Sequence, residues 1–163
     1  MDNRKIKLKL TVIHAKCSNC NMERILYFTS NYTYGERIVS TKSGKQCAYA
    51  NLLSENIVQE VEKYCTELYL ENNVSISPSK LARIVSSIYG ITCDDINGEK
   101  IDTISNTKCP NCLEKKLVED DNFGEQLAEI EAFAVTHYSW EKLGDNEKKD
   151  KVYRELIRQG YLE

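Results

Sequence analysis

Cysteine is the residue type in this chain with the clearest chemical potential, and four of its seven cysteines form two Cys-x-x-Cys motifs. The first lies in KCSNCN, from Cys17 to Cys20, and the second lies in KCPNCL, from Cys109 to Cys112. A two-residue spacing lets two thiolates turn inward from one tight loop, while the intervening backbone N–H groups point at sulfur. Two such loops supply four sulfurs at the tetrahedral angles that Zn²⁺ accepts. The spacing therefore predicts a metal site.

Strands are expected to carry the first motif. Residues 5–13 alternate Lys with Ile and Leu, which predicts a strand with Ile6, Leu8 and Leu10 on one face. A second strand-like stretch, 22–28, follows the motif. A turn-rich piece, 29–35, leads to a third strand over 36–41 and a turn at Lys42 to Lys45. The first 50 residues therefore predict a small antiparallel meander.

The middle of the chain is expected to be helical. Between residues 51 and 71, apolar residues recur at the spacing of one helix face. A second helix is expected near Ser77, which can cap it, with Pro78 at its first position and Gly90 ending it in the left-handed conformation. The long spacer between the two helices favours a packing pair over a helix-turn-helix reader of DNA.

The second motif is expected to follow a β-hairpin. Asn97-Gly98 is the favoured pair for a type I′ turn, and it lies between the strand-like stretches 91–96 and 99–104. A calcium loop aligned on this glycine is excluded, because its first and twelfth positions would be Cys93 and Ile104, which lack the required oxygen.

Helices are expected to complete the chain after a short strand at 115–118 and an acidic turn at 119–122. Residues 124–137 predict one helix, and Asp145 to Gln159 predict another, which Asp145 can cap and Gly160 ends. The inward residues of the two helices are expected to be Leu127, Ile130, Phe133, Ala134, Val152, Leu156 and Ile157.

The order strand, Cys-x-x-Cys knuckle, strand, found twice, resembles the zinc-ribbon superfamily over residues 5–28 and 100–118. The resemblance implies one structural Zn²⁺. It implies as ligands Cys17, Cys20, Cys109 and Cys112. The knuckles are 88 residues apart, against about 15–20 in most Cys₄ sites. The longer loop costs only about 1–1.5 kcal/mol in chain entropy, roughly a tenth of what a structural zinc contributes.

The expected fold class is therefore α+β within a single domain, residues 1–163. A small antiparallel zinc-ribbon-like sheet, about 5–50 and 91–118, would carry a helical insert at about 51–90. C-terminal helices would occupy about 123–163.

Other roles for the cysteines and a neighbouring histidine stay open. A thioredoxin-like motif is disfavoured because neither pair opens a helix, and an iron–sulfur cluster is disfavoured because two paired knuckles suit a single ion. His14, three residues before Cys17, could replace one sulfur. Cys65 and Cys93 are expected in the core, and Cys47 is either a packing residue or a reactive thiol.

The charge distribution suggests an alternative partner. The chain carries a net charge of −3, yet residues 1–50 contain nine Lys or Arg against three Asp or Glu, a net +6. This basic arm could pair with the acidic remainder, or it could hold nucleic acid by phosphate contacts and base stacking. The candidate residues for nucleic-acid binding are Arg24, Tyr27, Arg37, Lys42 and Lys45, with Phe28, Tyr32 and Tyr34 beside them.

The first functional expectation is a non-catalytic, zinc-stabilised adaptor or inhibitor that binds another protein. The ten tyrosines could supply a contact surface, or they could simply cover a modest core. There is no phosphate loop or nucleophile elbow, and only two histidines. The lack of an apolar spanning run or signal segment favours the cytoplasm, where thiols stay reduced, and an odd number of cysteines fits poorly with a complete disulfide framework. Abundant Lys, Asn and Ile are typical of an AT-rich genome, such as that of a low-GC bacterium or a phage.

Overall fold

A long central strand organises the sheet end of the molecule. In the computed structural model, which describes residues 5–29, 35–114, 117–120 and 124–163, this strand is β1 (Ile6–Cys17). β2 (Glu23–Thr29) pairs with one edge of β1, and β5 (Leu117–Glu119) and β6 (Glu125–Ala132) pair in succession with the other. All three pairings are antiparallel. The strands expected over 5–13 and 22–28 are therefore confirmed.

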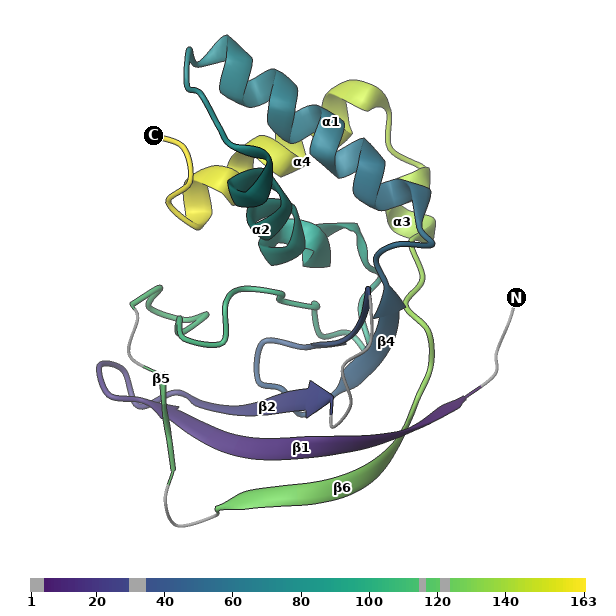
Figure 1. Cartoon of the computed structure of the whole chain (residues 1–163), viewed down its shortest axis with the longest axis vertical. Helices are drawn as coiled ribbons and strands as arrows, with labels where there is room; N and C mark the ends of the chain where they lie inside the picture. Colours follow the sequence, from purple (N-terminus) through teal and green to yellow (C-terminus); the bar gives the residue numbers. More distant parts are fainter. Residues whose placement is uncertain (1–4, 30–34, 115–116, 121–123) are drawn as a thin grey trace.

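A second, two-stranded sheet lies between this sheet and the helices (Figure 1). It consists of β3 (Glu36–Ser40), which was expected, and β4 (Cys47–Asn51), which was not. β4 and its turn delay the first helix, whose expected start was residue 51. The buried residues of this region form a small apolar cluster made of Val39, Ala48, Ala50, Tyr89, Cys93 and Ile101.

Helices form the other end of the molecule, as Figure 1 shows. They are α1 (Asn56–Glu71), α2 (Pro78–Ile88), the short α3 (Tyr138–Glu141) and α4 (Asp145–Arg158). The Ser77 hydroxyl caps α2 by accepting a hydrogen bond from the backbone N–H of Lys80, as expected. The buried faces of the helices share one core, which consists of Val61, Tyr64, Cys65, Leu68, Tyr69, Leu81, Ile84, Val85, Ile88, Trp140, Val152, Leu156 and Leu162.

The antiparallel sheets and the four helices confirm an α+β fold. None of the helices in the described part of the chain has the length and apolar character needed to cross a membrane.

The helix expected over 124–137 is wrong, because that stretch forms β6 and runs along β1 from Ile6 to Ile13. Leu127 and Phe133, expected to face inward, are 79% and 50% exposed. Apolar residues three or four apart have the spacing of a helix face, but pairing with a free edge of β1 aligns eight residue pairs in antiparallel register and provides backbone hydrogen bonds along the whole strand.

The structure corrects three further details. Asn97 and Gly98 both have positive φ, as a type I′ turn requires, but only one isolated bridge, Ile96 to Glu99, closes it and no hairpin strands follow. Gly90 does not end α2 in the left-handed conformation. It lies in a 3₁₀ turn (Tyr89–Thr92), where an added Cβ would come within 2.9 Å of the Ile101 carbonyl oxygen. Gly144, rather than Asp145, is the N-cap of α4.

Candidate metal centre

The structure brings the two Cys-x-x-Cys motifs together. The Cys17 and Cys112 sulfurs lie 3.6 Å apart, and so do those of Cys20 and Cys109. All four sulfurs lie within 4.8 Å of one another. Two knuckles separated by 88 residues in sequence therefore form one compact cluster that could hold a metal ion.

The two knuckles have the same backbone conformation. In the first, the N–H of Cys17 donates to the Met22 carbonyl at 2.9 Å, and the N–H of Asn21 donates to the Cys17 carbonyl. In the second, the N–H of Cys109 donates to the Glu114 carbonyl at 2.8 Å, and the N–H of Leu113 donates to the Cys109 carbonyl. The fourth residue after the first cysteine has positive φ in both, 59° for Asn21 and 63° for Leu113. This shared turn directs both sulfurs of each knuckle to one side.

Hydrogen bonds to sulfur accompany these turns. The backbone N–H of Asn19 donates to the Cys17 sulfur at 3.4 Å, and that of Asn111 donates to the Cys109 sulfur at the same distance. The Asn111 side-chain amide crosses to the Cys20 sulfur of the other knuckle at 3.6 Å. Because these groups donate toward sulfur, they favour the thiolate over the thiol.

The electrostatics of the cluster are uneven. Hydrogen bonds from the Met22 backbone and the Asn111 side chain lower the pKa of Cys20 to about 6, and the Asn19 side chain lowers that of Cys112. Burial raises the pKa of Cys109 to about 11, although its sulfur lies 3.6 Å from that of Cys20. Cys20 therefore releases its proton more readily than Cys109, whose thiolate is disfavoured by burial.

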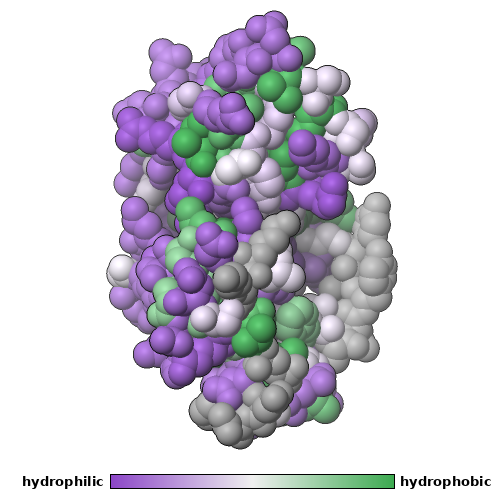
Figure 2. Space-filling model, turned by 90° about the vertical axis from the view of Figure 1, so that its left-hand side faces the viewer, coloured by the Kyte–Doolittle hydropathy of each residue, from purple (hydrophilic) through white to green (hydrophobic). Residues whose placement is uncertain are grey.

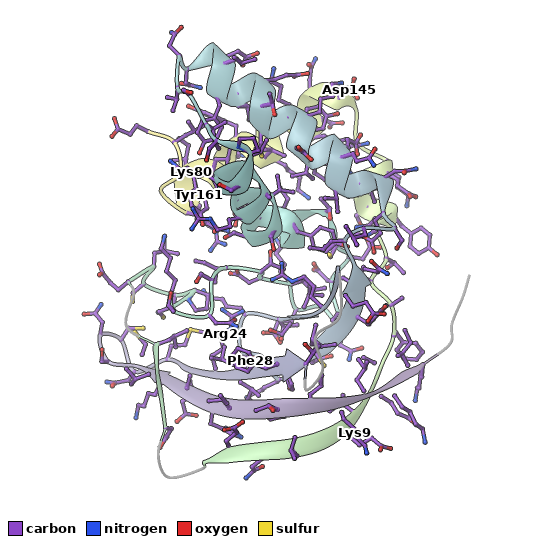
Figure 3. All side chains as sticks on the ribbon, viewed as in Figure 1. Lys9, Arg24, Phe28, Lys80, Asp145 and Tyr161 are labelled. Carbon is purple, nitrogen blue, oxygen red and sulfur yellow. The ribbon has the colours of Figure 1, made fainter. Side chains whose placement is uncertain are left out.

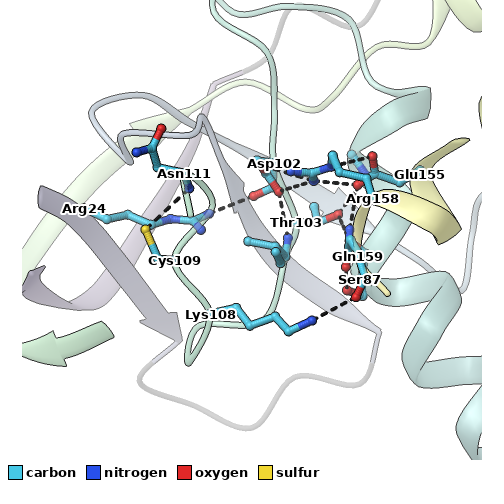
Figure 4. A network of polar contacts seen from close by, with 12 residues as sticks. Arg24, Ser87, Asp102, Thr103, Lys108, Cys109, Asn111, Glu155, Arg158 and Gln159 are labelled. Atoms are coloured by element: carbon cyan, nitrogen blue, oxygen red, sulfur yellow. Dashed lines mark hydrogen bonds and ion pairs between the residues drawn. The ribbon is translucent and has the colours of Figure 1, made fainter. Parts of the chain in front are cut away.

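Arg24 lies beside the cluster, as Figure 4 shows, and is only 3% exposed. One guanidinium nitrogen donates to the Asp102 carbonyl at 2.8 Å, whereas Nε and Nη1 have no partner among the described atoms. Burial lowers the Arg24 pKa, and the negative charges of Asp102 and of Cys109 in its thiolate form oppose that shift. Orphaned buried donors of this kind fit a neighbouring site that carries negative charge.

The donor set suits a soft or borderline metal. Four thiolates around one point, with backbone N–H groups directed at sulfur, match the ligand type and number of a closed tetrahedral site. Four thiolates on a divalent ion leave a net negative charge, which the Arg24 guanidinium would offset. The residues present therefore fit a single divalent ion.

The second knuckle is tied to the helices by a polar network (Figure 4). Lys108 Nζ donates to the Gln159 carbonyl at 2.9 Å, and Gln159 also contacts Ser87 on α2. Arg158 bridges Glu155 and the Asp102 carboxylate. The end of β1 therefore positions the first knuckle, and this network positions the second.

The candidate nucleic-acid residues differ in burial, although Tyr27, Phe28 and Arg37 line one shared hollow. Arg24 is buried, so its expected phosphate contact is corrected to the internal contacts described above. Arg37 is half-buried and donates to the Ser86 carbonyl at 3.0 Å, and the Tyr27 hydroxyl donates to the Gly44 carbonyl. Lys42 and Lys45 are exposed, with Lys42 3.4 Å from the Asn111 side chain. Phe28 is 37% exposed, whereas Tyr32 and Tyr34 lie outside the described residues.

The remaining cysteines lie away from the cluster. Cys65 and Cys93 are buried, as expected, and burial raises the pKa of each thiol to about 12. Cys47 is half-buried, and burial raises its pKa as well, which argues against a reactive thiolate. The compact group that could hold a metal ion, found among the described residues, contains the four knuckle cysteines and does not include His14.

A second polar cluster was not expected from the sequence. His137 Nε2 lies 3.2 Å from both the Tyr89 hydroxyl and a Glu55 carboxylate oxygen, and its Nδ1 lies 2.9 Å from the Thr92 carbonyl. Burial lowers the His137 pKa, but the Glu55 and Thr92 contacts outweigh it and raise the value overall. The three side chains come from distant positions, so no local pattern predicted them.

Comparison with family models, curated proteins and solved structures finds no match to this chain.

Proposed function

We propose that Cys17, Cys20, Cys109 and Cys112 bind one structural Zn²⁺ and that the chain is a non-catalytic, zinc-stabilised binding protein. The observation that supports the proposal most is the four-sulfur cluster, whose sulfurs lie within 4.8 Å of one another. A four-thiolate set favours zinc over the harder cations that prefer oxygen ligands. The paired knuckles resemble those of zinc ribbons in ligand spacing and in their repeated turn.

A structural role for the ion follows from its ligands. Four thiolates complete the tetrahedral shell of Zn²⁺ and leave no position for water or substrate. The ion would instead close a loop of 88 residues and so join β1 to the segment that contacts α2 and α4. On this proposal, the metal contributes folding free energy, and function belongs to a surface elsewhere on the protein.

The expected protein partner gains little support from the tyrosines. Tyr64, Tyr69 and Tyr89 are buried, and among the eight described tyrosines only Tyr138 and Tyr153 are exposed, at 44% and 37%. An adaptor or inhibitor role therefore stays a prediction without a defined contact surface.

Native mass spectrometry tests the zinc proposal. The purified chain is expected to carry one Zn²⁺, and Co²⁺ substitution is expected to give the thiolate-to-metal charge-transfer absorption of a four-sulfur site. Cys109→Ser should lose the ion, whereas Cys47→Ser, a matched change outside the cluster, should retain it. A folded chain that takes up neither metal, or a Cys109→Ser variant that binds metal as the unchanged chain does, would contradict the proposal.

A further inference from the structure

A basic groove lies between the helical end of the molecule and the second knuckle. Its volume is about 770 Å³, within the range of about 300–1,000 Å³ that ligand sites usually occupy. α2 forms one wall, and the segments 103–108 and 159–161 form the other. Figure 3 shows Lys80 on α2 beside Tyr161 after α4, and Figure 2 looks onto this side of the molecule, where hydrophilic residues predominate.

The charge of the groove has one sign. Four cations line it, namely Arg37, Lys80, Arg83 and Lys108, and no Asp or Glu is among its described lining residues. This local excess contrasts with the net charge of −3 for the whole chain. Four like charges around one concave surface raise the local concentration of an anion. The groove is therefore expected to attract an anionic ligand.

Two of the four cations are fixed by hydrogen bonds within the protein, and the other two are exposed. Arg37 is fixed by the Ser86 backbone carbonyl and hydroxyl, and Lys108 is fixed by the Gln159 carbonyl at 2.9 Å. Lys80 and Arg83 are exposed, and neither makes an ion pair with an acidic residue in the described part of the chain. They lie one turn apart on α2, so both side chains project from the same face. Arg37 and Lys108 therefore place positive charge at fixed positions, whereas the side chains of Lys80 and Arg83 are free to adjust to a ligand.

The other lining groups match a phosphate ligand. Ser86, Ser105 and Thr107 place hydroxyl groups in the groove, which can donate to phosphate oxygens. Arg offers a forked set of donors suited to phosphate, and Lys supplies point charges. Lys80 is also within the first turn of α2, where the helix dipole favours negative charge.

We propose that this groove binds a chain of spaced phosphate groups, as in the backbone of a single-stranded nucleic acid. The proposal deepens the proposed function, because it names what the binding protein binds, but it uses none of the four cysteines. It also moves the nucleic-acid site away from the residues expected from the sequence, of which only Arg37 lines the groove. Metal binding would support the site through Lys108, the residue that precedes Cys109.

Fluorescence anisotropy with a labelled, short single-stranded oligonucleotide tests the proposal on the zinc-loaded full chain. If the four cations contact four phosphates, the logarithm of the association constant should fall with the logarithm of salt concentration with a slope of about −3. Affinity should therefore fall about fiftyfold between about 50 and 200 mM salt. The absence of binding at low salt would overturn the proposal.

A pair of double variants assigns the binding to the groove. Lys80→Ala with Arg83→Ala should weaken binding at low salt at least about tenfold and reduce the salt slope by about 1.4. Lys63→Ala with Arg154→Ala makes the same change in net charge at exposed positions outside the groove and should leave both quantities nearly unchanged. Equal losses in the two variants, or none in the first, would contradict a groove site.

Competition experiments define the ligand. A polyglutamate peptide should displace the strand poorly, and displacement as strong as that by unlabelled oligonucleotide would overturn phosphate recognition in favour of an acidic protein. Displacement by inorganic tripolyphosphate would assign the groove to free phosphate chains, and its failure would assign it to nucleic acid. Metal content separates the two proposals: a chain with one zinc that binds no strand refutes only the groove, whereas a metal-free chain that binds through Lys80 and Arg83 refutes only the zinc.

Discussion

The helical end and the sheet end of the molecule are stabilised in different ways. The helices share one apolar core of thirteen buried residues, from Val61 on α1 to Leu162 after α4. In the described part of the chain, neither apolar cluster includes a residue of β1 or β2, although Leu10 and Leu26 are individually buried. The cysteine cluster lies at the end of β1, where those clusters do not reach. A metal is thus expected where burial of apolar area contributes least.

The largest expected effect comes from removing one ligand. Cys109→Ser should lower the free energy of unfolding of the sheet end by at least about 4 kcal/mol, because a structural zinc contributes on the order of 10 kcal/mol. Urea unfolding should then show two transitions, in which the sheet end unfolds first and the helices unfold second. Circular dichroism and Trp140 fluorescence can follow the two transitions. A single transition equal to that of the unchanged chain would show that the sheet end does not depend on the cluster.

The next effect concerns the helical core. Leu156→Ala removes a fully buried side chain and should lower the free energy of unfolding by about 2–5 kcal/mol. Zinc content should remain one ion per chain, because Leu156 belongs to the core of the other end. The neighbouring Ile157→Ala, at 39% exposure, serves as the control and should cost less than about 1 kcal/mol in urea unfolding. Loss of the metal in Leu156→Ala would contradict the separate stabilisation of the helical end and the sheet end.

A smaller effect concerns the strained turn of the second knuckle. Leu113 has a φ of 63°, a left-handed conformation that costs a residue with a bulky side chain roughly 1–2 kcal/mol, whereas the first knuckle has Asn21 at the equivalent position. Leu113→Asn should therefore stabilise the zinc-loaded chain by about 1 kcal/mol. The reciprocal Asn21→Leu should destabilise it by a similar amount. Thermal unfolding measures both, and destabilisation by Leu113→Asn would mean that packing of this leucine outweighs its strain.

The smallest expected effect is a pH dependence outside the metal site. The pKa of His137 is raised, so its ion pair with Glu55 stabilises the fold fully below the ordinary value of 6.5 and less as pH rises through the folded-state pKa. Hydrogen bonds from His137 and Tyr89 outweigh burial and lower the Glu55 pKa, so its contribution is lost as pH falls below 4.5. Urea unfolding of His137→Gln should lose the decline above 6.5, and an unchanged pH profile would contradict the pairing.

The sequence predicted features that depend on local pattern. Alternation predicted β1, a strand-like stretch predicted β2, and apolar spacing predicted α1, α2 and α4. The Cys-x-x-Cys spacing predicted a cluster that joins two knuckles separated by 88 residues. Each of these signals is contained within one segment. Because a tetrahedral site needs four ligands, one Cys-x-x-Cys pair also predicts contact with the other.

Features that depend on several segments were not predictable in this way. The stretch that forms β6 has apolar residues at helical spacing, and only the free edge of β1 decides its conformation. Arg24 was expected to contact phosphate as part of the basic N-terminal third, and its internal contacts depend on Asp102 and Cys109 from another part of the chain. The basic groove likewise combines Arg37, α2 and two later segments, so the charge balance of any single segment hides it.

Hydrogen exchange with and without a zinc chelator tests most directly whether a metal joins the two knuckles. Chelation is expected to remove amide protection from both knuckles together, including the amides of Asn21 and Leu113, while the amides of α1 and α4 remain protected. Equal protection of both knuckles before and after chelation, in a chain shown to be free of metal, would contradict the account.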